Sequence, residues 1–119
     1  MNKQQQQSLT QRLVNFRDER SWQQFHSIKE LILSLNLEAG ELLELTQWQS
    51  GEQFDEAIGD QQIKSRLEEE CADVLAYLLL IAERADFDIV QAAHNKIDKN
   101  ELKYPVEKSK GKSTKYDRL

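Results

Sequence analysis

Apolar residues in this chain recur at intervals of three and four positions, the spacing of one helical face, rather than alternating as they do in a strand. Residues that break helices are scarce, with one proline and four glycines among 119 residues. The pattern predicts an all-α protein with four main helices. The length indicates a single domain over residues 1–119.

The first two helices are bounded by a polar lead and by a capping signal. Residues 1–7 are polar and rich in glutamine, and we expect them to be disordered ahead of a helix over about 8–17. Ser27 and Glu30 have the spacing of a capping box, which predicts a second helix from Ile28 to about Gly51.

The second half of the chain carries equally plain start and stop signals. Gly59 followed by Asp60 predicts an N-cap after a connecting segment over 52–59, in which a short turn of helix is left open, and the third helix then reaches about Ala85. Asp88 is a suitable N-cap for a fourth helix over about 89–103, which Pro105 ends because proline lacks the backbone amide. We expect the tail over 105–119 to be loose in the absence of a ligand or partner.

Composition indicates a cytoplasmic protein with no membrane partner. The longest apolar run, Leu78–Ala82, is too short to cross a bilayer, and the first residues lack the apolar segment of a secretory signal. Cys71 is the only cysteine, so no internal disulfide can form, and we expect it in the core.

The charge of the chain is unevenly distributed. The net charge is −5, whereas the tail over 105–119 has five basic residues against two acidic ones, a charge of +3 that leaves −8 for the rest. A body this acidic argues against binding to a nucleic-acid polymer and suits binding of a cation.

Two carboxylate pairs lie at helical spacing, Glu38 with Glu41 and Glu70 with Asp73. Residues three apart are neighbours on one helical face, so two such helices packed together would offer four carboxylates to one point. A single pair of this kind is more often a solvated face. Here both pairs lie at the edges of the expected apolar stripes, where an unpaired carboxylate is costly.

The donor chemistry of these four residues favours a hard cation. Oxygen ligands alone suit Mg²⁺, or else Mn²⁺, better than Zn²⁺. A di-iron bundle would require Glu-x-x-His, and Gln91 stands three residues before His94. We therefore interpret the four carboxylates as candidate catalytic and metal-binding residues of a phosphate-processing enzyme.

Aromatic side chains could supply flat surfaces on which a nucleobase stacks. The segment Trp22-Gln23-Gln24-Phe25-His26 precedes the second helix, Trp48 lies near its end, and Tyr77 follows Asp73 by four residues. The competing interpretation is that these aromatic residues belong to the core or to an interface.

In this order, the motifs resemble the MazG-like all-α nucleotide pyrophosphohydrolases, and among them the branch that contains dCTP pyrophosphatase. The resemblance rests on residues 19–26, 37–48, 69–78, 96–105 and 115–116, and it extends from about Leu9 to Tyr116. It implies a four-helix bundle-like subunit that forms homo-oligomers, with tetramers favoured over dimers.

The resemblance also implies an activity, the Mg²⁺-dependent hydrolysis of a (d)NTP to a (d)NMP and pyrophosphate, in house-cleaning of dCTP-like or modified nucleotides. Glu38, Glu41, Glu70 and Asp73 would hold the metal, while residues 22–26, Trp48 and Tyr77 would bind base and sugar. Weaker candidates for phosphate contacts are Lys96, Asn100, Lys103, Lys115 and Tyr116.

One residue departs from the pattern of this family. The animal dCTP enzymes have a polar histidine where this chain has Leu13, which leaves the base preference open. Two other functions also stay open at this point: a non-catalytic helical interaction module of the same fold, and a pyrophosphohydrolase for another phosphoanhydride.

Overall fold

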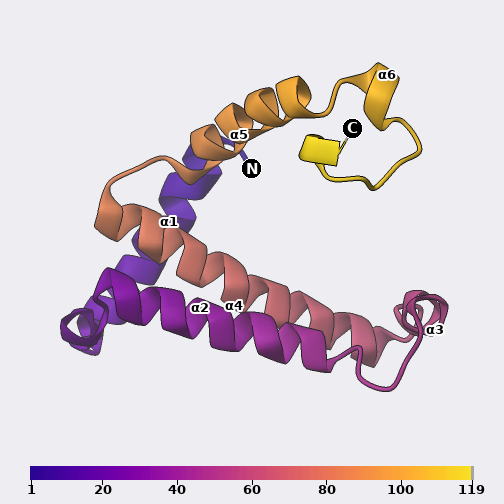
Figure 1. Cartoon of the computed structure of the whole chain (residues 1–119). Coiled ribbons are helices and arrows are strands. Elements are labelled where there is room, and N and C mark those ends of the chain that lie inside the picture. Colours follow the sequence, from indigo (N-terminus) through magenta and orange to yellow (C-terminus); the bar gives the residue numbers. More distant parts are fainter. Residues whose placement is uncertain (119) are drawn as a thin grey trace. The chain divides into compact units, whose positions relative to one another are not determined.

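A computed structural model describes residues 1–118, and within that range its regular secondary structure is entirely helical (Figure 1). The prediction of an all-α fold is confirmed. The elements are α1 (Lys3–Glu19), η1 (Trp22–Phe25), α2 (Ile28–Glu44), α3 (Gly51–Ala57), α4 (Gln61–Ala85), α5 (Ile89–Lys103), α6 (Val106–Ser109) and η2 (Tyr116–Arg118), where η marks a 3₁₀ turn.

The described chain divides into two compact units, residues 1–86 and residues 87 onward, and the single domain expected from the length stays a prediction. The boundary follows α4, whose C-cap residue, Asp86, has a left-handed backbone conformation with φ 59° and ψ 61°. Aspartate tolerates this conformation better than most residues, so it can end a long helix abruptly.

The first unit is built on α2 and α4, which lie side by side, while α1 packs against α4 and η1 packs against α1 (Figure 1). Its buried apolar side chains among the described residues are few: Leu31 from α2, with Leu79, Leu80 and Ala82 from α4. The core is therefore concentrated between the two long helices.

Side-chain caps open these helices at the predicted positions. The Ser27 hydroxyl accepts a hydrogen bond from the backbone amide of Glu30 at 3.1 Å, which begins α2. The carboxylates of Asp60 and Asp88 accept backbone amides at 2.9 and 3.0 Å, which begin α4 and α5. Each cap satisfies an amide that the first helical turn leaves unpaired.

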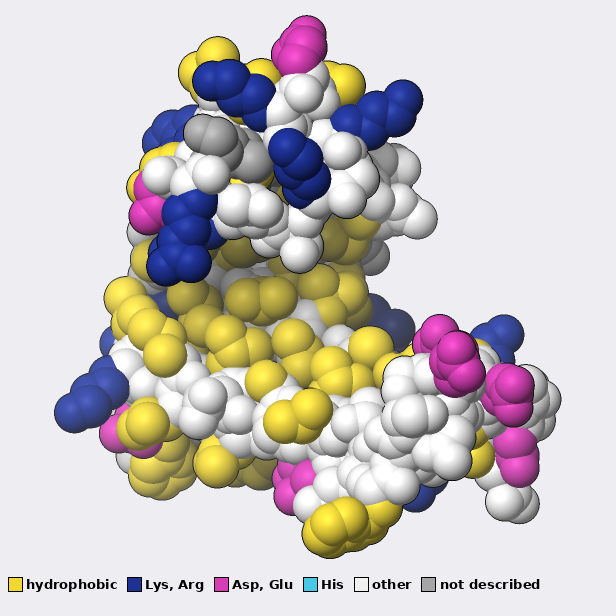
Figure 2. All heavy atoms as spheres, turned by 45° about the vertical axis from the view of Figure 1, so that its right-hand side comes forward, with side chains coloured by type: hydrophobic (Ala, Val, Ile, Leu, Met, Phe, Trp, Pro, Cys, Tyr) yellow, Lys and Arg dark blue, Asp and Glu magenta, His cyan; other side chains and the backbone are white. Residues whose placement is uncertain are grey.

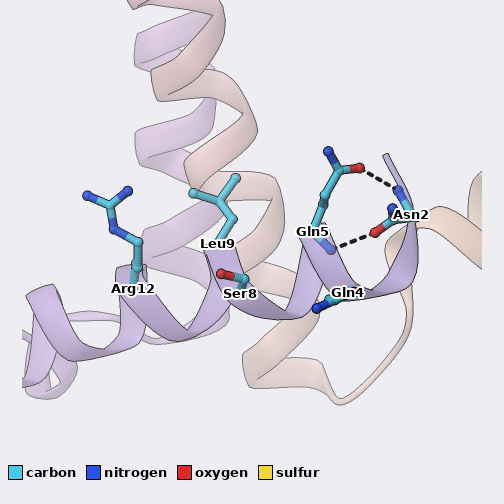
Figure 3. Close-up of a pocket in the computed structure, with 6 residues that line it drawn as sticks. All are labelled: Asn2, Gln4, Gln5, Ser8, Leu9 and Arg12. Atoms are coloured by element: carbon cyan, nitrogen blue, oxygen red, sulfur yellow. Dashed lines mark hydrogen bonds between the residues drawn. The ribbon is translucent and has the colours of Figure 1, made fainter.

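The expected disorder of residues 1–7 is wrong, because α1 begins at Lys3. The side chains of Asn2 and Gln5 bond reciprocally to each other's backbone amides, at 2.7 and 3.0 Å (Figure 3). This capping box, with Asn2 in the place of the usual serine or threonine, holds the first turn. The two residues line a polar groove together with Gln4, Ser8, Leu9 and Arg12.

The connection between α2 and α4 also differs from the prediction. α2 ends at Glu44 rather than near Gly51, and Trp48 in the following turn has a positive φ of 63°. Ser50 and Gln53 then form a capping box that opens α3, so the connecting segment contains the short helix that the sequence left open.

In the second unit, the tail is more ordered than expected. α6 follows Pro105 directly, and η2 brings Tyr116 against the end of α5. The Tyr116 ring meets Tyr104 edge to face at 6.1 Å, and the Lys103 ammonium lies 4.7 Å from its centre. Aromatic and cation–π contacts hold this segment.

Much apolar surface of the first unit is exposed. Ile32, Leu33, Leu37 and Leu43 of α2 are 49–69% exposed, and Figure 2 shows hydrophobic side chains gathered over the long helices. Cys71 is also exposed, which contradicts its expected place in the core, because the described chain offers α4 too few partners to cover that position. No described helix is both long and apolar enough to span a membrane.

Candidate active site

Three of the four predicted metal ligands converge between the two long helices. Glu38 and Glu41 project from α2 and Glu70 projects from α4, and one carboxylate oxygen of each lies within 4.8 Å of the other two. The i, i+3 spacing places the α2 pair on one face, and the packing of α2 along α4 brings Glu70 to it.

These carboxylates are electrostatically strained. Partial burial raises the pKa of Glu38 to about 7, assisted by a hydrogen bond with Glu41 and by the negative charges of Glu41, Asp73 and Glu70. The pKa of Glu70 is raised by burial and by the charges of Glu41 and Asp73, against a smaller opposing effect of Arg66. The cluster therefore binds positive charge or protons more readily than isolated glutamates do.

The residues present fit a bound divalent cation. Oε2 of Glu38 and Oε2 of Glu70 are both buried and have no hydrogen-bond partner among the described residues. Buried carboxylate oxygens are normally paired, and a cation would satisfy both of these. A set made only of carboxylates suits a hard ion with oxygen ligands, such as Mg²⁺, Mn²⁺ or Ca²⁺.

Asp73, the fourth predicted ligand, occupies the border of the cluster. It follows Glu70 by one helical turn, is exposed, and contributes its charge to the raised pKa of both Glu38 and Glu70. The three-residue cluster does not include it, but it lines the neighbouring cavity. Asp73 thus connects the acidic cluster with the second feature of the site.

That feature is a cavity of about 200 Å³ formed by α1, η1 and α4. Its walls are largely aromatic and apolar, and Phe16 and Trp22 meet edge to face at 5.7 Å. The lining residues are Leu13, Phe16, Arg17, Trp22, His26, Asp73, Ala76, Tyr77 and Leu80. Such a cavity can hold a flat ring next to the carboxylates.

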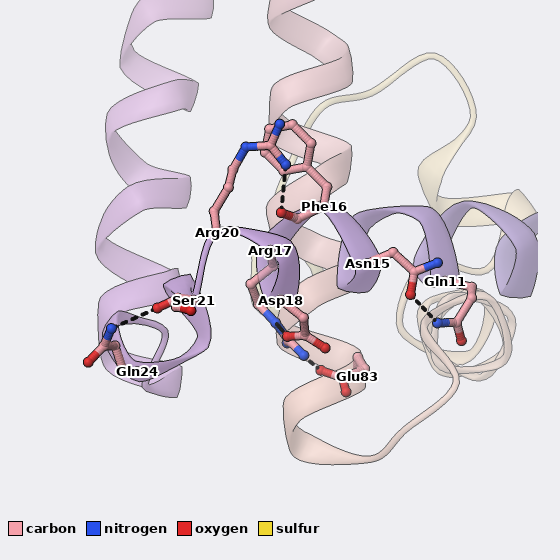
Figure 4. A network of polar contacts seen from close by, with 9 residues as sticks. All are labelled: Gln11, Asn15, Phe16, Arg17, Asp18, Arg20, Ser21, Gln24 and Glu83. Carbon is pink, nitrogen blue, oxygen red and sulfur yellow. Dashed lines mark hydrogen bonds and ion pairs between the residues drawn. The ribbon is translucent and has the colours of Figure 1, made fainter.

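A network of polar contacts links α1 to α4 at Arg17, which lines the cavity (Figure 4). Arg17 is only 9% exposed, and it donates from Nε to Asp18 at 2.9 Å and from Nη1 to Glu83 of α4 at 3.1 Å. His26 has a buried, unpartnered Nδ1, and burial together with the positive Arg17 and Arg84 lowers its pKa. His26 is therefore neutral at physiological pH, with one ring nitrogen as donor and the other as acceptor.

The structure brings some of the predicted substrate residues together and leaves others apart. Trp22, His26 and Tyr77 line the cavity, whereas Gln23, Gln24 and Phe25 are not part of its lining. Gln24 donates to the Ser21 carbonyl at 2.8 Å, and Phe25 is 62% exposed.

The remaining predicted residues lie outside this cavity. Trp48 is 96% exposed in the turn after α2. The weaker phosphate candidates all belong to the second unit: Lys96, Asn100, Lys103, Lys115 and Tyr116. Their roles stay predictions.

Sequence reasoning missed Phe16, Arg17, Ala76 and Leu80, which also line the cavity. The sequence could have predicted which residues of α1 line the cavity. Leu13, Phe16 and Arg17 lie at i, i+3 and i+4 and so share one helical face. An arginine within an apolar stripe is unusual, and Arg17 is indeed buried, which charged side chains seldom are.

Comparison with known protein families finds a match for this architecture. The MazG-like family matches residues 33–119, which include all four carboxylates. The chain belongs to this family. The cavity of this MazG-like chain uses α4 from the matched range and α1 and η1 from outside it.

Individual relatives agree with the family assignment. Mouse (Mus musculus) dCTP pyrophosphatase 1 is 41% identical over 106 residues, 89% of this chain and 62% of that protein. The human (Homo sapiens) protein of the same name is 39% identical over 107 residues, with the same shares. The chain thus spans less than two-thirds of the length of these curated relatives.

A solved structure also supports the family assignment and the all-helical fold. A pyrophosphatase from Archaeoglobus fulgidus superposes with a TM-score of 0.78 at 40% identity, over 83% of this chain and 91% of the archaeal chain. The resemblance seen in the sequence motifs and the all-helical fold are therefore both confirmed.

Proposed function

We propose that this protein is a nucleoside triphosphate pyrophosphohydrolase, which converts a (d)NTP and water into a (d)NMP and pyrophosphate. The observation that carries the proposal is the acidic cluster of Glu38, Glu41 and Glu70 beside an aromatic cavity, with Asp73 shared between them. The cluster suits the cation that a triphosphate requires, and the cavity suits a base. The names of the relatives support this combination.

Glu38, Glu41, Glu70 and Asp73 would hold Mg²⁺ in this proposal. When bound, the ion supplies positive charge that offsets the charge of the phosphates and increases the acidity of a nearby water. A carboxylate oxygen left without a bond to the ion can accept the proton of the attacking water, and Glu38 and Glu41 are the candidates for this general base.

The cavity would hold the base, and dCTP or a modified relative of it is the substrate we favour. Trp22 and Tyr77 offer ring surfaces for stacking, and the neutral His26 offers a hydrogen-bonding edge. Asp73 borders both the cavity and the acidic cluster, so we place the sugar of the nucleotide beside it. The role we assign is removal of surplus or altered nucleotides in the cytoplasm.

The active protein would be a homo-oligomer, and we favour a tetramer over a dimer. The exposed apolar residues of α2 support association through this helix, because leaving them in water is unfavourable. Trp48 is almost fully exposed on a strained backbone, so we assign it to the cavity of a neighbouring subunit. Lys96, Asn100, Lys103, Lys115 and Tyr116 remain candidates for phosphate contacts.

The test is pyrophosphate release from dNTPs, NTPs and modified dCTPs, measured with Mg²⁺ and with EDTA. We expect metal-dependent release from the wild type and from Glu69→Gln, which changes an exposed glutamate of α4, and none from Glu41→Gln. Release in EDTA, or full activity of Glu41→Gln, would contradict the metal assignment.

The same experiment separates the proposed enzyme from a binding module. If no substrate reacts, a thermal-shift measurement with Mg²⁺ and a non-hydrolysable dCTP analogue separates the two remaining functions. A shift without turnover would point to another phosphoanhydride as substrate, and the absence of any shift would point to a non-catalytic protein.

A further inference from the structure

Arg17 is the one charged or polar residue in the described chain that reaches the burial of the core. Its position on the cavity wall is unusual, because every other buried residue that the structure describes is apolar. Burial of a guanidinium is expensive unless its donors are used, so what its hydrogen bonds do decides its role.

Two carboxylates orient the Arg17 side chain without using all of its donors. Nε donates to Asp18 on the same helix, and Nη1 donates to Glu83 on α4, as Figure 4 shows. A guanidinium carries five N–H groups in a planar fork, so these two bonds leave three. The two carboxylates also balance its charge, and Arg17 is one of the residues that line the cavity.

We propose that Arg17 determines base specificity by donating a pair of hydrogen bonds to O2 and N3 of cytosine. This inference rests on the proposed function, in which the cavity holds the base. Cytosine presents O2 and N3 as adjacent acceptors, which match a guanidinium fork. Uracil and thymine carry a proton on N3, which would face the arginine donors and repel them.

The surroundings of Arg17 favour this role over that of a clamp between α1 and α4 alone. A residue that only joined the two helices could lie anywhere along them. Arg17 instead lies in the wall of an aromatic cavity that also contains Trp22 and Tyr77. Leu13, Ala76 and Leu80 in the same wall offer no polar side-chain group to read a base. A site built to hydrogen-bond its substrate rejects the analogue that cannot form those bonds.

The test compares kcat/KM for dCTP with kcat/KM for dUTP in the wild type, Arg17→Met, Arg17→Lys and Glu83→Ala. We expect the wild type to prefer dCTP and Arg17→Met to lower that preference about tenfold or more, the size of a bidentate base contact. Arg17→Lys keeps the charge but loses the fork, so it should lose most of the preference too.

Glu83→Ala is the matched control for the clamp. It removes the bond between α1 and α4 but leaves the guanidinium held by Asp18. It should lower the melting temperature and weaken the preference for dCTP less than Arg17→Met does, because Asp18 still holds Nε. If Arg17→Met instead slows both substrates equally, Arg17 is a structural clamp and the inference is wrong.

Calorimetry with deoxycytidine and deoxyuridine tests the inference without hydrolysis. The wild type should bind deoxycytidine more tightly, and Arg17→Lys should bind the two nucleosides alike. A wild type that releases no pyrophosphate contradicts the proposed function, while these binding constants still decide the role of Arg17. A wild type that treats both bases alike overturns the role of Arg17 and leaves the proposed hydrolysis standing.

Discussion

Neutralising Glu38 should stabilise the metal-free protein while destroying its affinity for the metal. The carboxylate of Glu38 is partly desolvated, faces three other acidic residues, and has a buried oxygen without a partner. Glu38→Gln keeps the shape of the side chain and removes the charge. In EDTA at pH 8 we therefore expect a higher melting temperature than that of the wild type.

The magnitude follows from the pKa of Glu38, which is raised from 4.5 to about 7. At about 1.4 kcal/mol for each unit of pKa, ionisation of Glu38 costs the folded state about 3 kcal/mol. Solvent screens a side chain that is only partly buried, which reduces the cost to about 1–2 kcal/mol. For a chain of this length, relief of that cost corresponds to a rise of about 4–8 °C.

Differential scanning fluorimetry at constant protein concentration measures the change, with Glu69→Gln as the control at an exposed glutamate. The gain should shrink at pH 5, where the folded wild type already has Glu38 protonated. Mg²⁺ should raise the melting temperature of the wild type and of the control but not that of Glu38→Gln. An unchanged or lower melting temperature of Glu38→Gln in EDTA at pH 8 would refute the account of a strained cluster.

Four further predictions follow from other parts of the structure. Asp73→Asn should abolish pyrophosphate release with unchanged helical circular dichroism, because Asp73 borders both cluster and cavity; near-normal turnover would exclude that role. In EDTA the melting temperature of the wild type should fall as the pH rises from about 5 to about 8, because the raised pKa values of Glu38 and Glu70 mean that the folded state binds more protons than the unfolded one in this range, and saturating Mg²⁺ should remove the slope. Ser27→Ala should cost about 1 kcal/mol in urea unfolding because α2 loses its N-cap, and Ser27→Asp should retain most of the stability. Leu37→Lys should lower the mass measured by light scattering, because it places a charge on the exposed apolar face of α2; an unchanged mass would remove α2 from the interface.

The parts of the fold that the sequence predicts well are those set by local signals. Ser27, Asp60 and Asp88 each lie directly before the first helical residue, and a cap needs only the amides two or three positions ahead. The convergence of Glu38, Glu41 and Glu70 was predictable for a related reason. Helical spacing fixes each pair on one face, and the apolar stripes that flank the pairs turn both faces towards each other.

The parts that sequence reasoning missed depend on contacts between distant residues. Arg17 reaches Glu83, which lies 66 residues later, and only the packing of α1 against α4 reveals that this arginine lines a cavity. The tail was expected to be loose without a ligand or partner, yet the ring of Tyr116 contacts Tyr104 and Lys103 at the end of α5. Neither periodicity nor capping signals carry information about such pairs.

In the proposed assembly, the small core of the first unit would make the stability of this protein depend on its own concentration. Four buried apolar side chains give little folding free energy, so in the proposed assembly much of the stability must come from neighbouring chains. Newly made chains would then stay open to proteases until they meet partners, and dilution would shorten their lifetime. A cell that makes this protein at a low level would hold less of it than synthesis alone predicts, and activity would rise more steeply than expression.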